Sequence, residues 1–115
     1  MNKGKPYEDI ACKYLTQRGY EILFRNWHSK FGEIDIVALK GKKLVIAEVK
    51  GSQKGFPIWR VDCKKVKKIY LTYLSLLETY PELERFEVVF LTLTVSKKRV
   101  KEIKIVLDDC INHLQ

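Results

Sequence analysis

The chain has 115 residues, long enough for one domain with its own hydrophobic core, and we expect a single domain over residues 1–115. Its net charge of +8 at pH 7 favours a polyanionic partner, of which nucleic acid is the commonest, although a basic proteome or a hot habitat would produce the same balance. The longest uncharged run is nine residues, far below the roughly twenty that a membrane helix needs. We therefore expect a soluble, cytoplasmic protein with no membrane contact.

Cysteine usage argues against a disulfide framework and against a zinc site. Cys12, Cys63 and Cys110 are odd in number, far apart and without paired spacing. This pattern favours a reducing, intracellular compartment.

The first half of the chain predicts a helix, a strand and a hairpin. Pro6 and the apolar residues at helical spacing before Gly19 predict a helix over 6–18. Residues 20–27 alternate as a strand does, and residues 28–31 form a loop in which His28 is expected to be an exposed bystander. Two runs rich in Val and Ile, 32–39 and 44–50, predict a β-hairpin with a turn of two or four residues.

The second half predicts a loop, a long helix and a second hairpin. Residues 51–60 contain two glycines and a proline and predict a loop, and residues 61–79 predict a helix. The expected buried stripe of that helix consists of Val66, Ile69, Tyr70, Tyr73, Leu74 and Leu77. Strands are expected over 86–95 and 100–107, with a short helical turn in 108–115. Together these elements predict an α/β protein, a three-layer α/β/α sandwich with a mixed central sheet of four or five strands.

The first hairpin carries an unusual cluster of charge at its open end. Side chains alternate along strands, so Glu33, Asp35, Glu48 and Lys50 lie on one face, beside apolar residues nearer the turn. A four-residue turn would place Asp35 opposite Glu48 and Glu33 opposite Lys50, and a two-residue turn is expected to shift these pairs but keep the cluster. Two carboxylates about 5 Å apart repel by roughly 3 kcal/mol at an effective dielectric near 20, and one lysine offsets only part of that.

A divalent cation would offset the remaining repulsion. Oxygen ligands favour a hard ion such as Mg²⁺, for which Mn²⁺ can substitute, over zinc. Asp35 and Glu48 are therefore the expected metal ligands, with Lys50 placed to contact an attacking water or the charge that develops on a phosphate. This combination indicates phosphodiester cleavage.

Basic and aromatic residues after the hairpin are candidates for binding nucleic acid. In the loop 51–60, aromatic and basic residues alternate and could stack on bases and hold phosphates, although the aromatics could equally close the end of the core. The helix 61–79 begins with several lysines, at the end where the helix dipole disfavours positive charge, and phosphate binding would explain their position. The candidate nucleic-acid-binding residues are Lys54, Trp59, Arg60, Lys64, Lys65 and Lys68.

The order of these features resembles that of a known family. The chain is similar, over about residues 4–95, to the YraN-type family of uncharacterised bacterial proteins. That family belongs to the restriction-endonuclease-like, or PD-(D/E)xK, superfamily and is similar to archaeal Holliday-junction resolvases. The residues that carry the resemblance are Glu8, Gly19-Tyr20, Arg25-Asn26, Gly32-Glu33-Ile34-Asp35, Glu48-Val49-Lys50 and Lys65.

The resemblance implies a restriction-endonuclease-like fold with Asp35 and Glu48 as metal ligands and Lys50 as the catalytic lysine. It also implies that Glu8 is a further acidic member of the site, whereas the helix dipole alone would explain this residue as structural. Related resolvases work as dimers, so the resemblance allows a homodimer, although the sequence displays no clear dimer seam.

Two functional hypotheses follow. The first is a Mg²⁺-dependent endonuclease that hydrolyses phosphodiester bonds in DNA, with branched or damaged DNA among the candidate substrates. The second is a non-catalytic module that binds nucleic acid or a protein partner on the same fold, in which the basic surface acts and the acidic cluster is a structural relic.

Overall fold

The centre of the molecule is a mixed five-stranded β-sheet. The computed structural model describes residues 5–55 and 62–111. The strands follow the chain in spatial order, and only β3 and β4 pair in parallel. Their bounds are β1 (Glu21–Ser29), β2 (Gly32–Lys40), β3 (Lys43–Ser52), β4 (Glu87–Ser96) and β5 (Arg99–Lys104).

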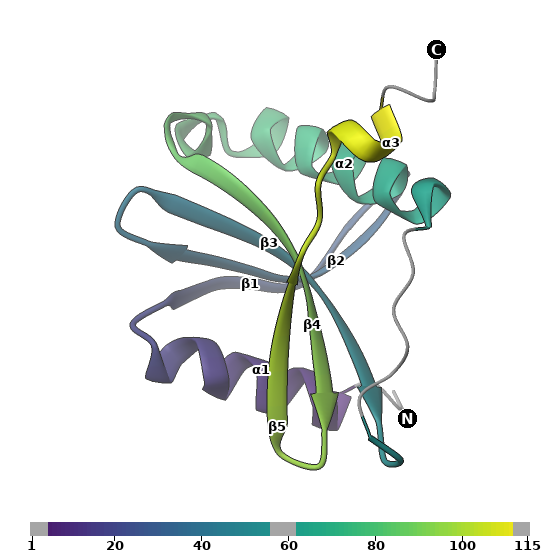
Figure 1. Cartoon of the computed structure of the whole chain (residues 1–115). Coiled ribbons are helices and arrows are strands. Elements are labelled where there is room, and N and C mark those ends of the chain that lie inside the picture. The colour runs from purple at the N-terminus through teal and green to yellow at the C-terminus, as the bar shows by residue number, and fades with distance from the viewer. Residues whose placement is uncertain (1–4, 56–61, 112–115) are drawn as a thin grey trace.

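Helices cover both faces of this sheet (Figure 1). Helix α1 (Lys5–Gln17) packs on one face, and α2 (Cys63–Thr79) packs on the other together with the short α3 (Asp108–Ile111). A 3₁₀ turn, η1 (Pro81–Arg85), connects α2 to β4. The expected α/β class with helices around a mixed sheet is confirmed, and the architecture is consistent with a restriction-endonuclease-like fold. Within the described ranges, no helix is both long and apolar enough to cross a membrane.

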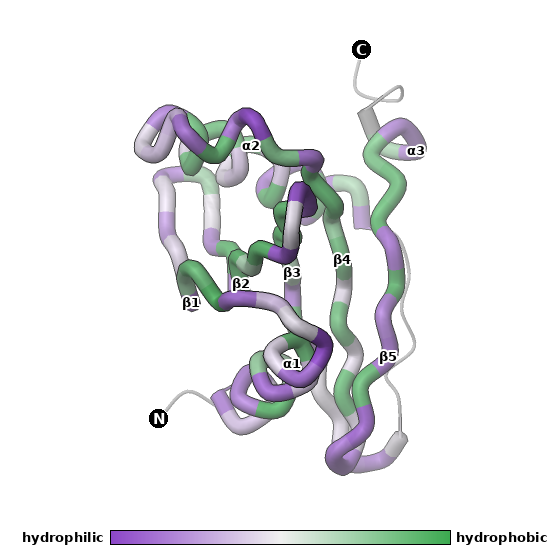
Figure 2. Tube along the Cα trace, turned by 90° about the vertical axis from the view of Figure 1, so that its left-hand side faces the viewer, coloured by the Kyte–Doolittle hydropathy of each residue, from purple (hydrophilic) through white to green (hydrophobic). Residues whose placement is uncertain are grey.

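Each face of the sheet has its own apolar core. Figure 2 shows that the strand segments between the helices are largely hydrophobic. On the α2 face, Val37, Leu44 and Ile46 pack against Val66 and Leu76. On the α1 face, the intervening strand residues pack against the helix; they include Ile36, Ala38, Val45 and Ala47, with Ala11 and Leu15 from α1. The alternation of strand side chains therefore puts β2 and β3 in contact with both helices.

The hairpin β2–β3 has a two-residue turn, and its strands separate before they reach the charged residues. Lys40 pairs with Lys43, and Leu39 pairs with Leu44. A four-residue turn would give the same register, with Leu39 opposite Leu44 and one pair fewer. The expectation that a two-residue turn shifts the pairs is therefore wrong. Pairing stops at Ile36 and Ala47. Asp35 and Glu48 thus lie at a fork between the strands.

Two local expectations are corrected by the structure. His28 lies in β1 and not in a loop, because β1 continues to Ser29 and pairs with the start of β2. Leu74 of α2 is 38% exposed, whereas Thr72 and Leu76 are completely buried. The buried stripe of α2 is therefore rotated relative to the expected one, because the position of the sheet decides which side of the helix is covered.

The expectation that the cysteines are unpaired is also wrong. Cys63, the first residue of α2, forms a disulfide with Cys110 of α3, and their Cα atoms are 5.2 Å apart. These residues are 47 positions apart in the chain, so no local spacing could reveal the pair. The return of the chain from β5 to the α2 face brings them together, while Cys12 stays free.

Candidate metal and phosphate site

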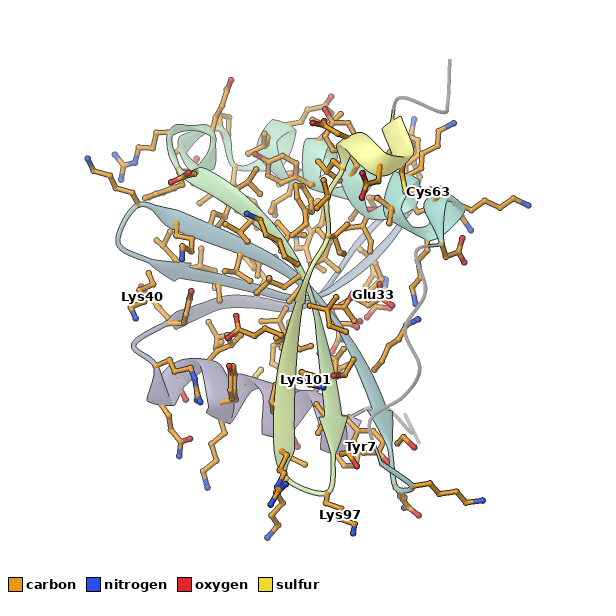
Figure 3. The ribbon with its side chains drawn as sticks, in the orientation of Figure 1. Tyr7, Glu33, Lys40, Cys63, Lys97 and Lys101 are labelled. Carbon is orange, nitrogen blue, oxygen red and sulfur yellow. A yellow bond between two sulfur atoms is a disulfide. The ribbon has the colours of Figure 1, made fainter. Side chains whose placement is uncertain are left out.

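An acid-lined hollow lies between the β2–β3 fork and the first turns of α2. Its volume is about 260 Å³. The residues that line it are Gly32, Glu33, Asp35, Glu48, Lys65, Lys68 and Ile69. Figure 3 shows Glu33 on the same side of the molecule as Cys63, which begins α2. The structure therefore brings together three of the acidic residues that the hairpin pattern selected.

The side chain of Asp35 accepts a backbone hydrogen bond at the point where the pairing of β2 with β3 ends. Its Oδ2 accepts a hydrogen bond of 2.7 Å from the backbone N–H of Val49. Burial raises the pKa of Asp35 from 3.8 to about 6; the Val49 hydrogen bond opposes the rise, and the charges of Glu8, Glu33 and Glu48 add to it. Burial is thus the main reason that the negative charge of Asp35 is disfavoured, and the neighbouring glutamates disfavour it further.

Glu48 projects from β3 into the same hollow and is almost completely buried. The ammonium group of Lys65 contacts its Oε1, and Lys50 Nζ lies 3.9 Å from the same atom. Nevertheless, Oε1 is buried and accepts no hydrogen bond from any described residue, so the contact with Lys65 lacks hydrogen-bond geometry. Lys65, which is a candidate nucleic-acid-binding residue and also part of the family resemblance, is thus the nearer cation to Glu48.

Glu8 reaches the site from the opposite face of the sheet. It is the buried acid of α1, and its Oε1 accepts a hydrogen bond of 3.0 Å from Asn26 Nδ2. Asn26 also donates to Glu33 Oε1 at 2.8 Å, so a single amide connects two carboxylates. An exposed helix-dipole role for Glu8 would not place it among these groups.

Asn26 and Arg25 were not among the candidate site residues. Asn26 lies opposite Asp35, between the paired residues Arg25 and Trp27, and has a φ of +53°. Arg25 binds Asp9 at 2.7 Å and lies 3.7 Å from Glu8. The available signal was an asparagine within a strand pattern, because asparagine favours turns and tolerates left-handed backbone.

The strand alternation breaks at the same place. Ile34 packs in the core on the α2 face and Ile36 in the core on the α1 face, although residues two apart normally share a face. The break turns Asp35 out of the regular pleat and into the fork. The left-handed Asn26 on the neighbouring strand accommodates it.

The residues fit a hard divalent cation through their chemistry. Asp35 and Glu48 provide oxygen donors, and the buried Glu48 Oε1 has an acceptor capacity that no described hydrogen bond uses. In the described parts of the chain, no three His, Cys, Asp or Glu side chains already converge on one point. One reason is that the ammonium group of Lys65 contacts Glu48 Oε1, the oxygen that a metal ion would need.

The predicted nucleic-acid-binding residues divide into groups. Lys65 and Lys68 line the acidic hollow, and Lys64 is exposed nearby at the start of α2. Asp62 caps α2 by accepting hydrogen bonds from the backbone N–H groups of Lys64 and Lys65, which fixes the first turn that carries them. Lys54 lines a different hollow at the end of β3. Trp59 and Arg60 lie outside the described residues.

Comparison with known proteins identifies one family. The model of a family described as "Uncharacterised protein family UPF0102" matches residues 7–91, which include every lining residue of the acidic hollow. A UPF0102 protein of Petrotoga mobilis is 41% identical over 100 residues, covering 85% of this chain and 89% of that protein. A UPF0102 protein of Kosmotoga olearia is 39% identical over 116 residues, covering 100% and 91%. One from Thermotoga maritima is 51% identical over 73 residues, covering 63% and 68%.

Proposed function

The chain belongs to the family UPF0102, and on this premise and the geometry of its site we propose that it is a Mg²⁺-dependent endonuclease that hydrolyses phosphodiester bonds in DNA. The proposal includes membership of the restriction-endonuclease-like superfamily. The observation that carries it is the fork between β2 and β3, where the half-buried Asp35 and the buried Glu48 line one hollow beside Lys50 and Lys65.

In this proposal Asp35 and Glu48 hold the metal ion. When bound, Mg²⁺ neutralises the charge of the scissile phosphate and lowers the pKa of a bound water. The hydrogen bond from Val49 N–H holds one oxygen of Asp35 in place and leaves its other oxygen for a ligand. Glu8 adds negative charge from α1, and Asn26 holds Glu8 and Glu33 in fixed positions.

Lysines provide the positive charge that a phosphodiester needs. Lys50 Nζ, close to Glu48, is placed to donate hydrogen bonds to the attacking water or to the phosphate oxygens as they gain charge. Lys65 and Lys68 line the same hollow, and Lys64 is exposed nearby in the first turn of α2. These groups would bind the DNA backbone independently of its sequence.

Cleavage assays with purified protein test the proposal. We expect Mg²⁺ or Mn²⁺ to support nicking of plasmid or cutting of a four-way junction, and EDTA to stop it. Asp35→Asn and Glu48→Gln should each reduce the rate at least 100-fold, while Glu82→Gln, an exposed acid in η1, serves as the matched control. Metal-dependent cutting that persists in Asp35→Asn would identify a contaminating nuclease and refute the proposal.

A second candidate is a binding module without catalysis, favoured by one specific observation. The acids already have partners: Lys65 contacts Glu48, Asn26 binds Glu8 and Glu33, and Val49 N–H binds Asp35. The cluster could therefore be stable without metal, and the basic surface alone could bind nucleic acid.

Thermal unfolding separates the two candidates. Mn²⁺ that binds the folded chain with a dissociation constant one hundredth of its concentration would stabilise it by about 2.7 kcal/mol. The endonuclease proposal expects such a rise in Tm for the native chain and none for Glu48→Gln. Salt-dependent DNA binding that is unchanged in Asp35→Asn and Glu48→Gln, with no effect of Mn²⁺ on Tm, would favour the binding module.

A further inference from the structure

A second hollow, lined by basic and uncharged residues, lies at the end of β3 that is remote from the β2–β3 turn. Its volume is about 540 Å³, and it lies where β3 ends beside the β4–β5 turn. Its lining residues are Gln53, Lys54, Gly55, Ser96, Lys97 and Arg99. The lining contains three cationic side chains and no carboxylate. We call it the basic hollow.

The cations of the basic hollow are not neutralised by the rest of the described structure. Within residues 5–55 and 62–111, none of Lys54, Lys97 and Arg99 forms an ion pair. By contrast, Arg25 is bound by Asp9, and Lys65 contacts Glu48. Three like charges around one space repel one another, so the hollow favours an anionic ligand.

Lys97 lies in a two-residue hairpin turn between β4 and β5. Lys97 has a φ of +52°, a left-handed conformation in which glycine or asparagine is ordinarily found. Ser96 pairs with both Ser52 of β3 and Arg99 of β5, so the turn is anchored next to the end of β3. Two-residue hairpin turns commonly require this conformation, and it fixes the direction in which the turn presents Lys97.

The basic hollow lies along β3 from the acidic hollow. Ser52, the last residue of β3, lies four positions after Glu48, which corresponds to about 13 Å of strand. An interval of this length is short enough for one DNA strand to contact both hollows. Figure 3 shows Glu33, Tyr7 and Lys97 in this order from the middle of the molecule down to the β4–β5 turn.

The strip between the two hollows carries an aromatic ring. The side chain of Tyr7 lies over Gly51, between Lys50 of the acidic site and Gln53 of the basic hollow. Tyr7 also lines a smaller depression of about 290 Å³ that shares Gln53 and Lys97 with the basic hollow. An aromatic ring beside cations is a common platform for nucleic acid.

We propose that the basic hollow binds a backbone phosphate of the DNA strand whose scissile bond lies in the acidic hollow. Lys54, Lys97 and Arg99 contact the phosphate oxygens, and β3 sets the distance between the two points of contact. The inference rests on the proposed function, because it takes DNA as the substrate. The lysines of α2 and the basic hollow then hold the strand on opposite sides of the acidic site.

Salt-dependent binding of a fluorescent DNA duplex, measured by anisotropy in EDTA, tests the inference without any cleavage. The variant is Lys97→Asn with Arg99→Gln, since asparagine tolerates the left-handed turn. Losing the contact with this one phosphate should reduce the slope of log K against log salt by about 0.9 and weaken binding at 0.1 M salt by roughly tenfold. Far-UV circular dichroism and Tm verify that the variant is folded.

The matched control removes two charges from the other end of the same strand. Lys42→Ala with Lys43→Ala lies at the β2–β3 turn, remote from both hollows, and should leave the slope close to native. Arg99→Lys keeps the charge and should also keep the slope. An unchanged slope in the Lys97/Arg99 variant, or equal losses in the control, would overturn the inference.

The phosphate site and the nuclease activity can fail independently, because the salt slope of DNA binding tests the first and metal-dependent cutting tests the second. Absence of metal-dependent cutting with a reduced slope in the Lys97/Arg99 variant would retain the basic hollow as a phosphate site and refute the nuclease. Metal-dependent cutting by the native chain, with an unchanged slope in the Lys97/Arg99 variant, would support the nuclease and refute the phosphate site. A native chain that binds no duplex at 50 mM salt would overturn the phosphate site directly.

Discussion

Asp35 shows how one side chain connects the fold to the site. It lies where β2 and β3 separate, and it accepts the Val49 N–H that has no partner across the hairpin at that point. The same burial that permits this hydrogen bond disfavours the negative charge, and three neighbouring glutamates disfavour it further. The carboxylate is therefore structurally useful as an acceptor but unfavourable as an anion unless a cation is bound.

The charge of Asp35 should make stability depend on pH. The folded pKa, about 6, exceeds the ordinary 3.8, so the folded chain holds an extra proton between about pH 4 and 6. The contribution of Asp35 to stability therefore falls as pH rises through this window. Asp35→Asn keeps an oxygen acceptor for Val49 N–H without the charge, so in EDTA its Tm should exceed the native Tm by several degrees at pH 7.5 and match it near pH 4.

Differential scanning fluorimetry across this pH range measures the difference in Tm. Glu82→Gln, which removes an exposed carboxylate, should show no such difference at either pH. A Tm difference for Asp35→Asn that is the same at pH 4 and pH 7.5 would mean that packing, and not ionisation, separates the two side chains.

At the scale of elements, α1 is held close to the end of β3 by a glycine. A Cβ built on Gly51 would overlap the ring of Tyr7, including Cγ, the ring atom nearest the backbone. The ring cannot move aside without displacing the first turn of α1, which carries Glu8 next to it. The absence of a side chain at Gly51 thus allows α1 to bring Glu8 to the acidic site.

Gly51→Ala should therefore weaken both stability and the site. Overpacking of this kind typically costs about 1–3 kcal/mol. Urea unfolding should show the loss, and the rate of metal-dependent cutting should fall with it. In a double-mutant cycle, Gly51→Ala should cost much less in a Tyr7→Ala background, since the clashing ring is absent. Equal costs in the two backgrounds would contradict the proposed overlap.

At the scale of the whole molecule, the disulfide closes the chain on the α2 face. Cys63 and Cys110 connect the start of α2 to the segment that follows β5, and Cys110 is completely buried. The link spans 47 positions, so it restricts a large part of the unfolded chain. Its position next to Lys65 also ties the basic start of α2 to the core.

Reduction should destabilise the protein globally. Chain entropy predicts a loss of about 4 kcal/mol for a closed loop of this size. Urea unfolding with and without a reductant measures the loss. The Cys110→Ala variant should be insensitive to the reductant, since Cys63 then has no partner, and a native chain that is equally insensitive would contradict the contribution of the disulfide.

Local periodicity was sufficient for much of the fold and part of the site. The alternation of apolar residues predicted β2 and β3 and placed Asp35 and Glu48 on one side, and helical spacing predicted α1 and α2. The same information mispredicted Leu74 as buried, because spacing identifies a stripe but not the angle at which the sheet meets it. Glu8 was assigned to the site only through a family resemblance, since its spacing explains it equally well as a helix-dipole residue.

The sequence by itself determined the elements, the excess of basic charge and the anomalous carboxylates of the first hairpin, since these follow from residue types at short separations. Tertiary structure alone decided that the strands separate at Asp35, that Asn26 connects Glu8 to Glu33, that Lys65 reaches Glu48, and that Cys63 pairs with Cys110. Each of these contacts depends on sheet twist, on helix placement or on the return of the chain over the α2 face. Such relations join residues that are distant in the chain, so no local pattern encodes them.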